Sequence, residues 1–118
     1  ENKVINSLEF SSDGSSLIGG CSSGEIFIWD TTKGSTPDVF AGHEGAISSL
    51  ALSKNSDILV TTGDDKKVKI WNYRNRKLIN EIKNNKHIFL AVDISPDSKY
   101  TVFVDTGGNI VVYDNILS

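Results

Sequence analysis

The sequence has little of several features that would indicate particular classes of protein. It holds a single cysteine, Cys21, so the chain cannot form an internal disulfide, and this excludes the disulfide-stabilised class of small secreted domains. Its apolar runs are too short to cross a bilayer, and its first residues do not resemble a signal peptide. We therefore expect no membrane insertion and an intracellular location. The cytoplasm is the expected compartment, with the nucleus and the cytoskeleton left open.

An excess of basic residues is also missing. The chain has 12 Lys and Arg against 15 Asp and Glu, a net charge of −3, so it lacks the overall basic surface of a nucleic-acid-binding domain. The charge is uneven, however, because residues 43–84 hold 8 basic and 5 acidic residues. The basic residues of this middle third have two interpretations, a solvated rim or a docking patch for an acidic partner.

Groups that could hold a metal or a cofactor are few. The two histidines, His43 and His87, and the lone cysteine do not have the spacing of a metal site. The pair Gly107-Gly108 does not lead into a helix whose amino end would hold a phosphate, and is better explained as a tight turn. We therefore expect no metal and no cofactor.

The sequence does contain an internal repeat. Shifting it against itself by 42 residues aligns, without a gap, three aromatic residues and the three polar residues that follow them. These columns are Trp29, Trp71 and Tyr113, then Asp30, Asn72 and Asp114. A period of 40 to 45 residues built from short strands is typical of one propeller blade per repeat.

Each copy of the repeat reads as short strands separated by turn residues. Apolar and polar residues alternate over short ranges, and no spacing of three and four persists long enough to predict a helix. Segments rich in Ser, Asp, Asn and Gly separate the ranges. The predicted strands are 4–10, 17–20, 25–29 and 38–41 in the first copy, 46–52, 57–62, 68–71 and 77–83 in the second, and 88–94, 100–104 and 110–113 in the third.

Two dipeptides of the middle copy, Gly42-His43 and Trp71-Asn72, resemble the Gly-His and Trp-Asp signature dipeptides of WD40 repeats. This resemblance implies an all-β chain of three consecutive propeller blades, residues 1–42, 43–84 and 85–118, the last without its outer strand. A closed propeller needs about four to eight blades. We therefore expect further blades, either from the same longer chain or from a second copy, and the lack of an initiator Met favours the longer chain.

The resemblance also implies a buried hydrogen-bond network in the middle blade. Asp65 would hold His43, the other imidazole nitrogen would reach a hydroxyl at Thr61 or Thr62, and that hydroxyl would accept the indole proton of Trp71. A catalytic Ser/Thr-His-Asp set uses the same residue types, but it is defined by geometry and exposure. We expect a structural network and no catalytic residue.

The outer two copies depart from this pattern. Glu1 and Asn85 stand in the place of His43, and Ser23 and Gly107 stand in the place of Asp65. His87 lies two places beyond the family position, so the role is not carried over to it. The first and third blades are therefore expected to depend on packing more than on a polar network.

The resemblance implies a non-catalytic scaffold that binds other proteins through its loops, within a multiprotein complex. The alternative is binding of an acidic polymer, either nucleic acid or an acidic protein tail, through the basic middle blade. Nucleic acid is disfavoured because the chain lacks an overall basic surface. Candidate partner contacts lie on the loops that share the face of Gly42-His43: Ser23, Glu44, Lys66, Lys67, His87 and Asn109.

Overall fold

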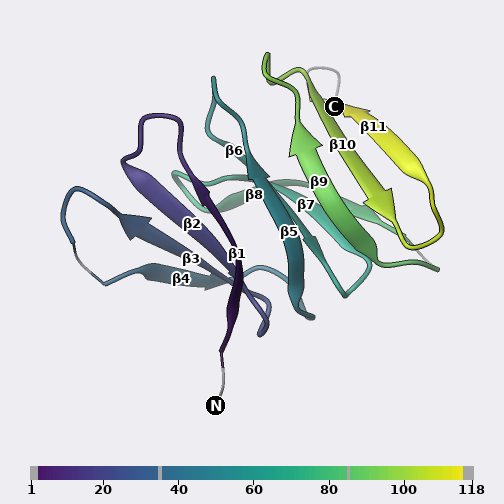
Figure 1. Ribbon diagram of the computed structural model, residues 1–118, viewed down its shortest axis with the longest axis horizontal. Helices are drawn as coiled ribbons and strands as arrows, with labels where there is room; N and C mark the ends of the chain where they lie inside the picture. The colour runs from purple at the N-terminus through teal and green to yellow at the C-terminus, as the bar shows by residue number, and fades with distance from the viewer. Residues whose placement is uncertain (1–2, 35, 85, 116–118) are drawn as a thin grey trace.

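The computed structural model describes residues 3–34, 36–84 and 86–115, and within these ranges the chain forms eleven β-strands and no helix. The strands make three antiparallel sheets that lie side by side in a flat molecule of 41 × 37 × 20 Å (Figure 1). Sheet 1 contains β1 (Ile5–Phe10), β2 (Ser16–Cys21), β3 (Glu25–Asp30) and β4 (Asp38–Ala41); sheet 2 contains β5 (Ile47–Leu52), β6 (Ile58–Gly63), β7 (Lys67–Asn72) and β8 (Lys77–Lys83); sheet 3 contains β9 (Phe89–Ile94), β10 (Tyr100–Asp105) and β11 (Ile110–Asp114).

The predicted all-β class is confirmed, and sheet 3 has three strands where the other sheets have four. The first strand of each sheet begins one residue later than predicted, at positions 5, 47 and 89. In each sheet the register between the first two strands shifts near the start of the first strand; these pairs are β1–β2, β5–β6 and β9–β10. The carbonyls of Val4, Ala46 and Ile88 still accept backbone hydrogen bonds from Ser22, Asp64 and Thr106. A β-bulge therefore shortens the regular ladder without breaking the pairing.

The repeat is visible in the turns as well as in the strands. The β2–β3, β6–β7 and β10–β11 turns each place one residue in the left-handed region, Gly24 at φ 89°, Lys66 at φ 68° and Gly108 at φ 83°. These residues are 42 positions apart. The lysine therefore adopts the backbone conformation that glycine supplies in the outer two sheets.

Sheets 1 and 2 pack face to face through apolar side chains. Ile26 and Ile28 of sheet 1 lie in one buried cluster with Leu59 and Trp71 of sheet 2. Phe40 of β4 meets the Trp71 ring edge to face, with the ring centroids 5.3 Å apart. Trp71 thus belongs to the boundary between two sheets and not to the interior of one.

A second interface of the same kind joins sheets 2 and 3. Val60, Val68 and Ile70 of sheet 2 form a buried cluster with Phe89 and Phe103 of sheet 3. The two phenylalanine rings meet edge to face at 5.4 Å. Each face of the central sheet is therefore covered, and one face of each outer sheet is not.

Candidate functional site

A chain of buried hydrogen bonds runs from the β4–β5 loop into sheet 2. His43 Nδ1 lies 2.9 Å from Asp65 Oδ1, and His43 Nε2 lies 2.8 Å from Thr61 Oγ1. Trp71 Nε1 donates to the same Thr61 oxygen at 3.0 Å. The sequence placed these four residues together, and the structure gives each of them a hydrogen bond to another member of the set.

The direction of each bond follows from the proton count. Trp71 can only donate, so its N–H fills one lone pair of Thr61 Oγ1, and the hydroxyl proton of Thr61 is then free to point at His43 Nε2. That nitrogen accepts, which leaves the imidazole proton on Nδ1, where it is donated to Asp65. Asp65 Oδ2 also accepts the backbone N–H of Glu44 at 3.1 Å. The network therefore fixes a neutral histidine and fastens the β4–β5 loop to strands β6 and β7.

Burial strongly influences the protonation states of His43 and Asp65. The side chain of His43 is fully buried, and removal from water lowers the pKa of its imidazole even though Asp65 works in the opposite direction. Burial is the largest single influence on Asp65 and acts to raise its pKa, but the hydrogen bonds from His43 and from the Glu44 N–H, together with nearby positive charge, outweigh it, so the pKa of this carboxyl is lowered. At neutral pH the pair is therefore a neutral imidazole facing a carboxylate.

The folded state should consequently lose stability as the pH falls below about 6.5, the ordinary pKa of an unfolded histidine. Between that value and the lower folded pKa of His43, the unfolded chain binds more protons than the folded chain, so the free energy of unfolding rises with pH. Urea denaturation over a pH series measures this slope. A His43→Gln variant removes the titrating group and should flatten the slope; an unchanged slope in the variant would assign the effect to other residues.

The geometry of the set does not suit nucleophilic catalysis. Thr61 is fully buried between the two sheets, and His43 is buried with it. Its hydroxyl already accepts from Trp71 and faces His43. A triad needs an exposed nucleophile with room for a substrate carbonyl. These residues therefore act as a clamp between a loop and two strands, as fully satisfied buried polar networks do.

Of the two threonines left open by the sequence, only Thr61 contacts the imidazole. Trp71 pairs with Leu59 across β6 and β7, so Thr61, two residues on, shares its face while Thr62 faces the opposite side. Thr62 Oγ1 lies 2.7 Å from Ser48 Oγ, and this serine donates to the carbonyl of Phe89 at 2.7 Å. Thr62 thus helps to join sheet 2 to sheet 3.

Sheet 3 contains a polar network that the sequence analysis missed. Asp105 is buried at the end of β10 and accepts hydrogen bonds from the Asn109 side chain and from the backbone N–H of Gly107 and Asn109. Its second oxygen accepts from Asn84 Nδ2 at 2.9 Å. The Asn109 side chain, followed by weaker contributions from the turn backbone, lowers the pKa of the Asp105 carboxyl. The third blade therefore has a polar network of its own in addition to its packing, and the sequence analysis did not predict this network.

Asp105, like Asp65, is a carboxylate that accepts hydrogen bonds from the loop entering its sheet, but it stands at a different position of the repeat. It aligns with Gly63, two residues before the position of Asp65, and it holds the incoming β8–β9 loop through Asn84, which aligns with Gly42. The signal in the sequence is the run from Asp105 to Asn109, an acid four residues before an amide across two glycines. Asn85, which aligns with His43, lies outside the described residues, as does Glu1 in the first copy.

His87 packs on the β10–β11 turn. A Cβ added at Gly107 would lie 2.6 Å from His87 Nε2, and His87 Nδ1 is 3.4 Å from the hydroxyl of Thr106. The imidazole is half-buried there and contacts neither Asp105 nor the backbone of sheet 2 through a short hydrogen bond. Glycine at position 107 leaves the space that this ring occupies.

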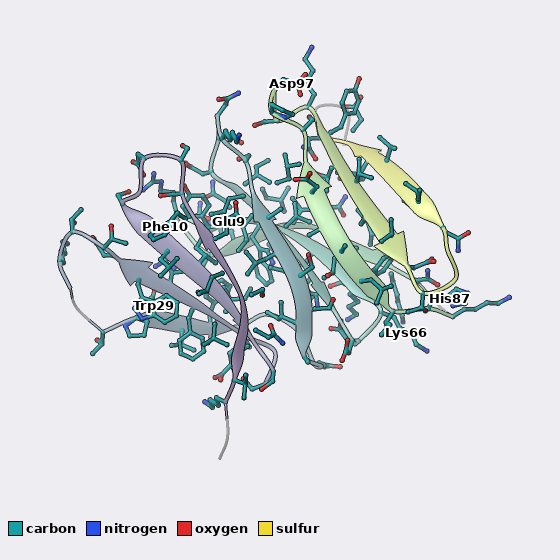
Figure 2. All side chains as sticks on the ribbon, viewed as in Figure 1. Glu9, Phe10, Trp29, Lys66, His87 and Asp97 are labelled. Atoms are coloured by element: carbon teal, nitrogen blue, oxygen red, sulfur yellow. The ribbon has the colours of Figure 1, made fainter. Side chains whose placement is uncertain are left out.

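The candidate partner contacts differ in how far they are already engaged. Ser23 and Glu44 are exposed, although the Ser23 hydroxyl donates to Glu25 at 2.9 Å, and Lys66 is half-buried at the tip of its turn. Lys67 lies 3.5 Å from Glu81, and the Asn109 side chain is bound to Asp105. These residues lie at one end of the sheets, on loops or, for Lys67, at the first position of β7. Figure 2 shows Lys66 and His87 close together at that end, with Asp97 at the other.

The basic residues of the middle sheet do not form one patch. Lys67 and Lys69 both face Glu81, while Arg74 bonds Asp57 at 3.1 Å at the opposite end of the sheet. Another arginine of that end, Arg76, bonds Asp38 of sheet 1 at 2.6 Å. Carboxylates of the same chain thus neutralise several of these basic side chains. This favours the interpretation of the basic residues as a solvated rim over their interpretation as a binding surface for an acidic polymer.

The part of the chain that the structure describes contains neither a cluster of metal ligands nor a membrane-spanning helix. Outside positions 1–2, 35, 85 and 116–118, no group of three or more His, Cys, Asp or Glu residues is arranged to hold a metal ion. Over the same ranges there is no helix with the length and apolarity needed to cross a membrane. Cys21 is a buried free thiol.

Comparison with known proteins gives matches over most of the chain. The family model described as "WD domain, G-beta repeat" matches residues 1–30 and 34–72. A periodic tryptophan protein 2 homolog of Neurospora crassa is 33% identical over 92 residues, which are 78% of this chain and 10% of the relative. A p21-activated protein kinase-interacting protein 1-like of Xenopus laevis is 32% identical over 106 residues, 87% of this chain and 28% of the relative.

Among solved structures, a chain in a crystal structure of the mitotic checkpoint complex superposes with a TM-score of 0.85 at 18% identity, covering 97% of this chain and 35% of that chain. At this identity the likeness concerns the fold alone. The chain spans about a third of the length of that solved chain, about a tenth of the Neurospora relative and just over a quarter of the Xenopus relative.

Proposed function

Because the chain belongs to the WD40-repeat family, we propose that it is a scaffold segment that binds other proteins through the loops around Gly42-His43, within a multiprotein complex. The name of the Xenopus relative describes a kinase-interacting protein, and this supports a role in protein interaction. We further propose an intracellular location, supported by the single buried thiol of Cys21.

The proposal depends on one observation about the end of the sheets that includes Gly42-His43. Hydrogen bonds hold the loops at this end against the sheets, while side chains at the tips of the loops are exposed to solvent. The β4–β5 loop is held through His43 and through Lys69, which donates to the Gly42 carbonyl at 2.6 Å. The β8–β9 loop is held through Asn84. Binding to such loops costs little conformational entropy, because the backbone is already ordered.

The proposed docking face can be tested with a triple variant, Ser23→Ala, Glu44→Ala and Lys66→Ala. These side chains are exposed or at a turn tip, so each change should alter the free energy of unfolding by less than about 0.5 kcal/mol. Binding of a protein partner should weaken at least about tenfold. Affinity capture from cells, followed by titration of a captured protein against both forms of the chain, measures this.

A matched control changes the opposite end. Lys33→Ala with Lys99→Ala alters two exposed side chains on loops at that end and should leave both binding and melting unchanged. If this double variant lost the captured protein while the triple variant retained it, the docking face would be the wrong one.

A further inference from the structure

Proline occurs only twice in the sequence, and each time it follows a residue with a hydroxyl group. The two dipeptides are Thr36-Pro37 on the β3–β4 loop and Ser95-Pro96 in the β9–β10 turn. A proline favours an extended conformation of the residue before it. An exposed and extended hydroxyl residue followed by proline is the substrate pattern of proline-directed protein kinases. The two dipeptides differ in whether their hydroxyl group is available to such an enzyme.

The Ser95 hydroxyl is occupied by its own turn. It donates to Asp97 Oδ1 at 2.6 Å and accepts the backbone N–H of Tyr100 at 3.0 Å. Ser11 and Ser53, at the same position of the other two copies, each accept a backbone N–H in the same way. A phosphate on the Ser95 oxygen would break both bonds of the turn, so this serine is a structural residue and a poor acceptor.

The Thr36 hydroxyl is not engaged in this way. Thr36 is exposed, and among the residues that the structure describes no hydrogen-bond partner reaches its hydroxyl. The two threonines at the start of the same loop are both bound: Thr31 donates to the carbonyl of Gly14 at 2.5 Å, and Thr32 donates to Asp30 Oδ1 at 2.6 Å. Thr36 is therefore the accessible acceptor of the two Ser/Thr-Pro dipeptides.

A cavity beside Thr36 is suited to hold a phosphate. It has a volume of about 350 Å³ and lies between the β3–β4 loop and the β7–β8 turn. Its lining includes Thr36 and the charged side chains of Asp30, Lys33, Asp38, Arg74 and Arg76. Three of these five charged side chains are cationic. Two of the cations are arginines, whose planar N–H donors match the oxygens of a phosphate.

The arginine side chains already reach this part of the loop. Arg76 Nη2 bonds Asp38 at 2.6 Å, two residues after Thr36. Two backbone carbonyls of the β7–β8 turn accept from Arg76 Nη1 and hold the side chain in place. Arg74 Nε donates to Asp57 at 3.1 Å, and this bond uses one of the five N–H donors of a guanidinium. A phosphate on Thr36 thus meets one fixed arginine and a second whose other donors can turn toward it.

We propose that Thr36 is a phosphorylation site for a proline-directed protein kinase, and that Arg74 and Arg76 bind the phosphate. The kinase transfers the γ-phosphoryl group of ATP: a P–O bond forms to Thr36 Oγ1, the bond from the γ-phosphorus to the β–γ bridging oxygen breaks, and ADP leaves. The hydroxyl proton passes to the catalytic aspartate of the kinase. The product carries a charge of about −1.5 to −2 at pH 7, and its contacts with the arginines fasten the β3–β4 loop to sheet 2.

This site lies at the end of the sheets opposite the proposed docking face, so either proposal can fail alone. Incubation of the chain with a mitogen-activated protein kinase and ATP labelled at the γ-phosphate tests it, with mass spectrometry to map the label. The phosphate is expected on Thr36. Thr36→Val should remove the label, and Ser95→Ala should keep it. Pro37→Ala should slow labelling at least about tenfold, the discrimination that an enzyme pocket achieves when an apolar group is missing. Label on Ser95 with none on Thr36, or a chain that stays unlabelled, would overturn the proposal.

Phosphorus NMR of the phosphorylated chain tests the role of the arginines. Nearby cations favour the dianion, so the second pKa of the phosphate should be lower in the folded chain than in the same chain unfolded in urea, although Asp30 and Asp38 act in the opposite direction. Arg74→Gln and Arg76→Gln should each reduce this difference. Lys99→Gln is the matched control, because Lys99 is exposed on the β9–β10 turn and does not line the cavity. A wild-type chain without the difference, or one whose difference persists in full in both arginine variants, would overturn the assignment of the arginines.

Discussion

Replacing Gly24 with alanine should lower the free energy of unfolding by about 2 to 5 kcal/mol, the sum of left-handed strain and overpacking. Gly24 has φ +89°, and an added Cβ would clash with the carbonyl oxygen of His43 and lie 2.7 Å from that of Gly45. Backbone atoms cannot move aside as a flexible side chain can. Its own carbonyl also accepts the N–H groups of Gly42 and His43, so the change displaces the loop that carries the histidine.

The matched control is Gly14→Ala. Gly14 has φ +76°, close to that of Gly24, but no atom lies within 4 Å of the added Cβ. This variant should lose only the strain, about 1 to 2 kcal/mol. Thermal unfolding of both variants, followed by circular dichroism, separates the two contributions. Equal melting temperatures would show that the clash predicted at Gly24 is relieved at no cost.

Replacing His43 with alanine should cost about 3 kcal/mol, because it leaves the Asp65 carboxylate and the Thr61 hydroxyl without their buried partner. For a domain of this size the melting temperature should fall by roughly 10 °C or more. Calorimetry measures the change. A variant that melts like the wild type would show that the imidazole contributes nothing to holding the loop.

Two controls separate the network from the general effect of removing an imidazole. His87→Ala removes a half-buried ring whose nearest hydroxyl is 3.4 Å away, and it should cost less than about 1 kcal/mol. Trp71→Phe keeps an aromatic ring and removes the indole N–H. Its cost and that of His43→Ala should not add in the double variant, because both act through Thr61.

The sequence predicted the strands and the middle network because both follow a regular period. The aromatic column at Trp71 is 42 residues from its neighbours, and the network residues stand at the family's positions. The choice between Thr61 and Thr62 depended on the register of β6 against β7. A single shift in that register would exchange the two faces of the strand, so composition and spacing left the choice open.

The network of sheet 3 escaped prediction for a different reason. Asp105 reaches the same loop from a position two residues earlier, and Asn84 meets it through a side chain where the middle copy has a glycine. A search for the family's residue types at the family's positions finds neither. The physical requirement, a carboxylate that accepts from the incoming loop, is met by either arrangement, and only the folded geometry shows which one is used.

The clamp of the middle sheet requires His43 to be a neutral imidazole enclosed between Asp65 and Thr61, and nitrogen NMR of the histidine rings over a pH series tests this directly. We expect the proton of His43 on Nδ1, an unprotonated Nε2, and a pKa below the ordinary value of about 6.5. A His43 ring that gains its second proton at or above that value, with the neutral form protonated on Nε2, would contradict the structure proposed for the whole middle sheet.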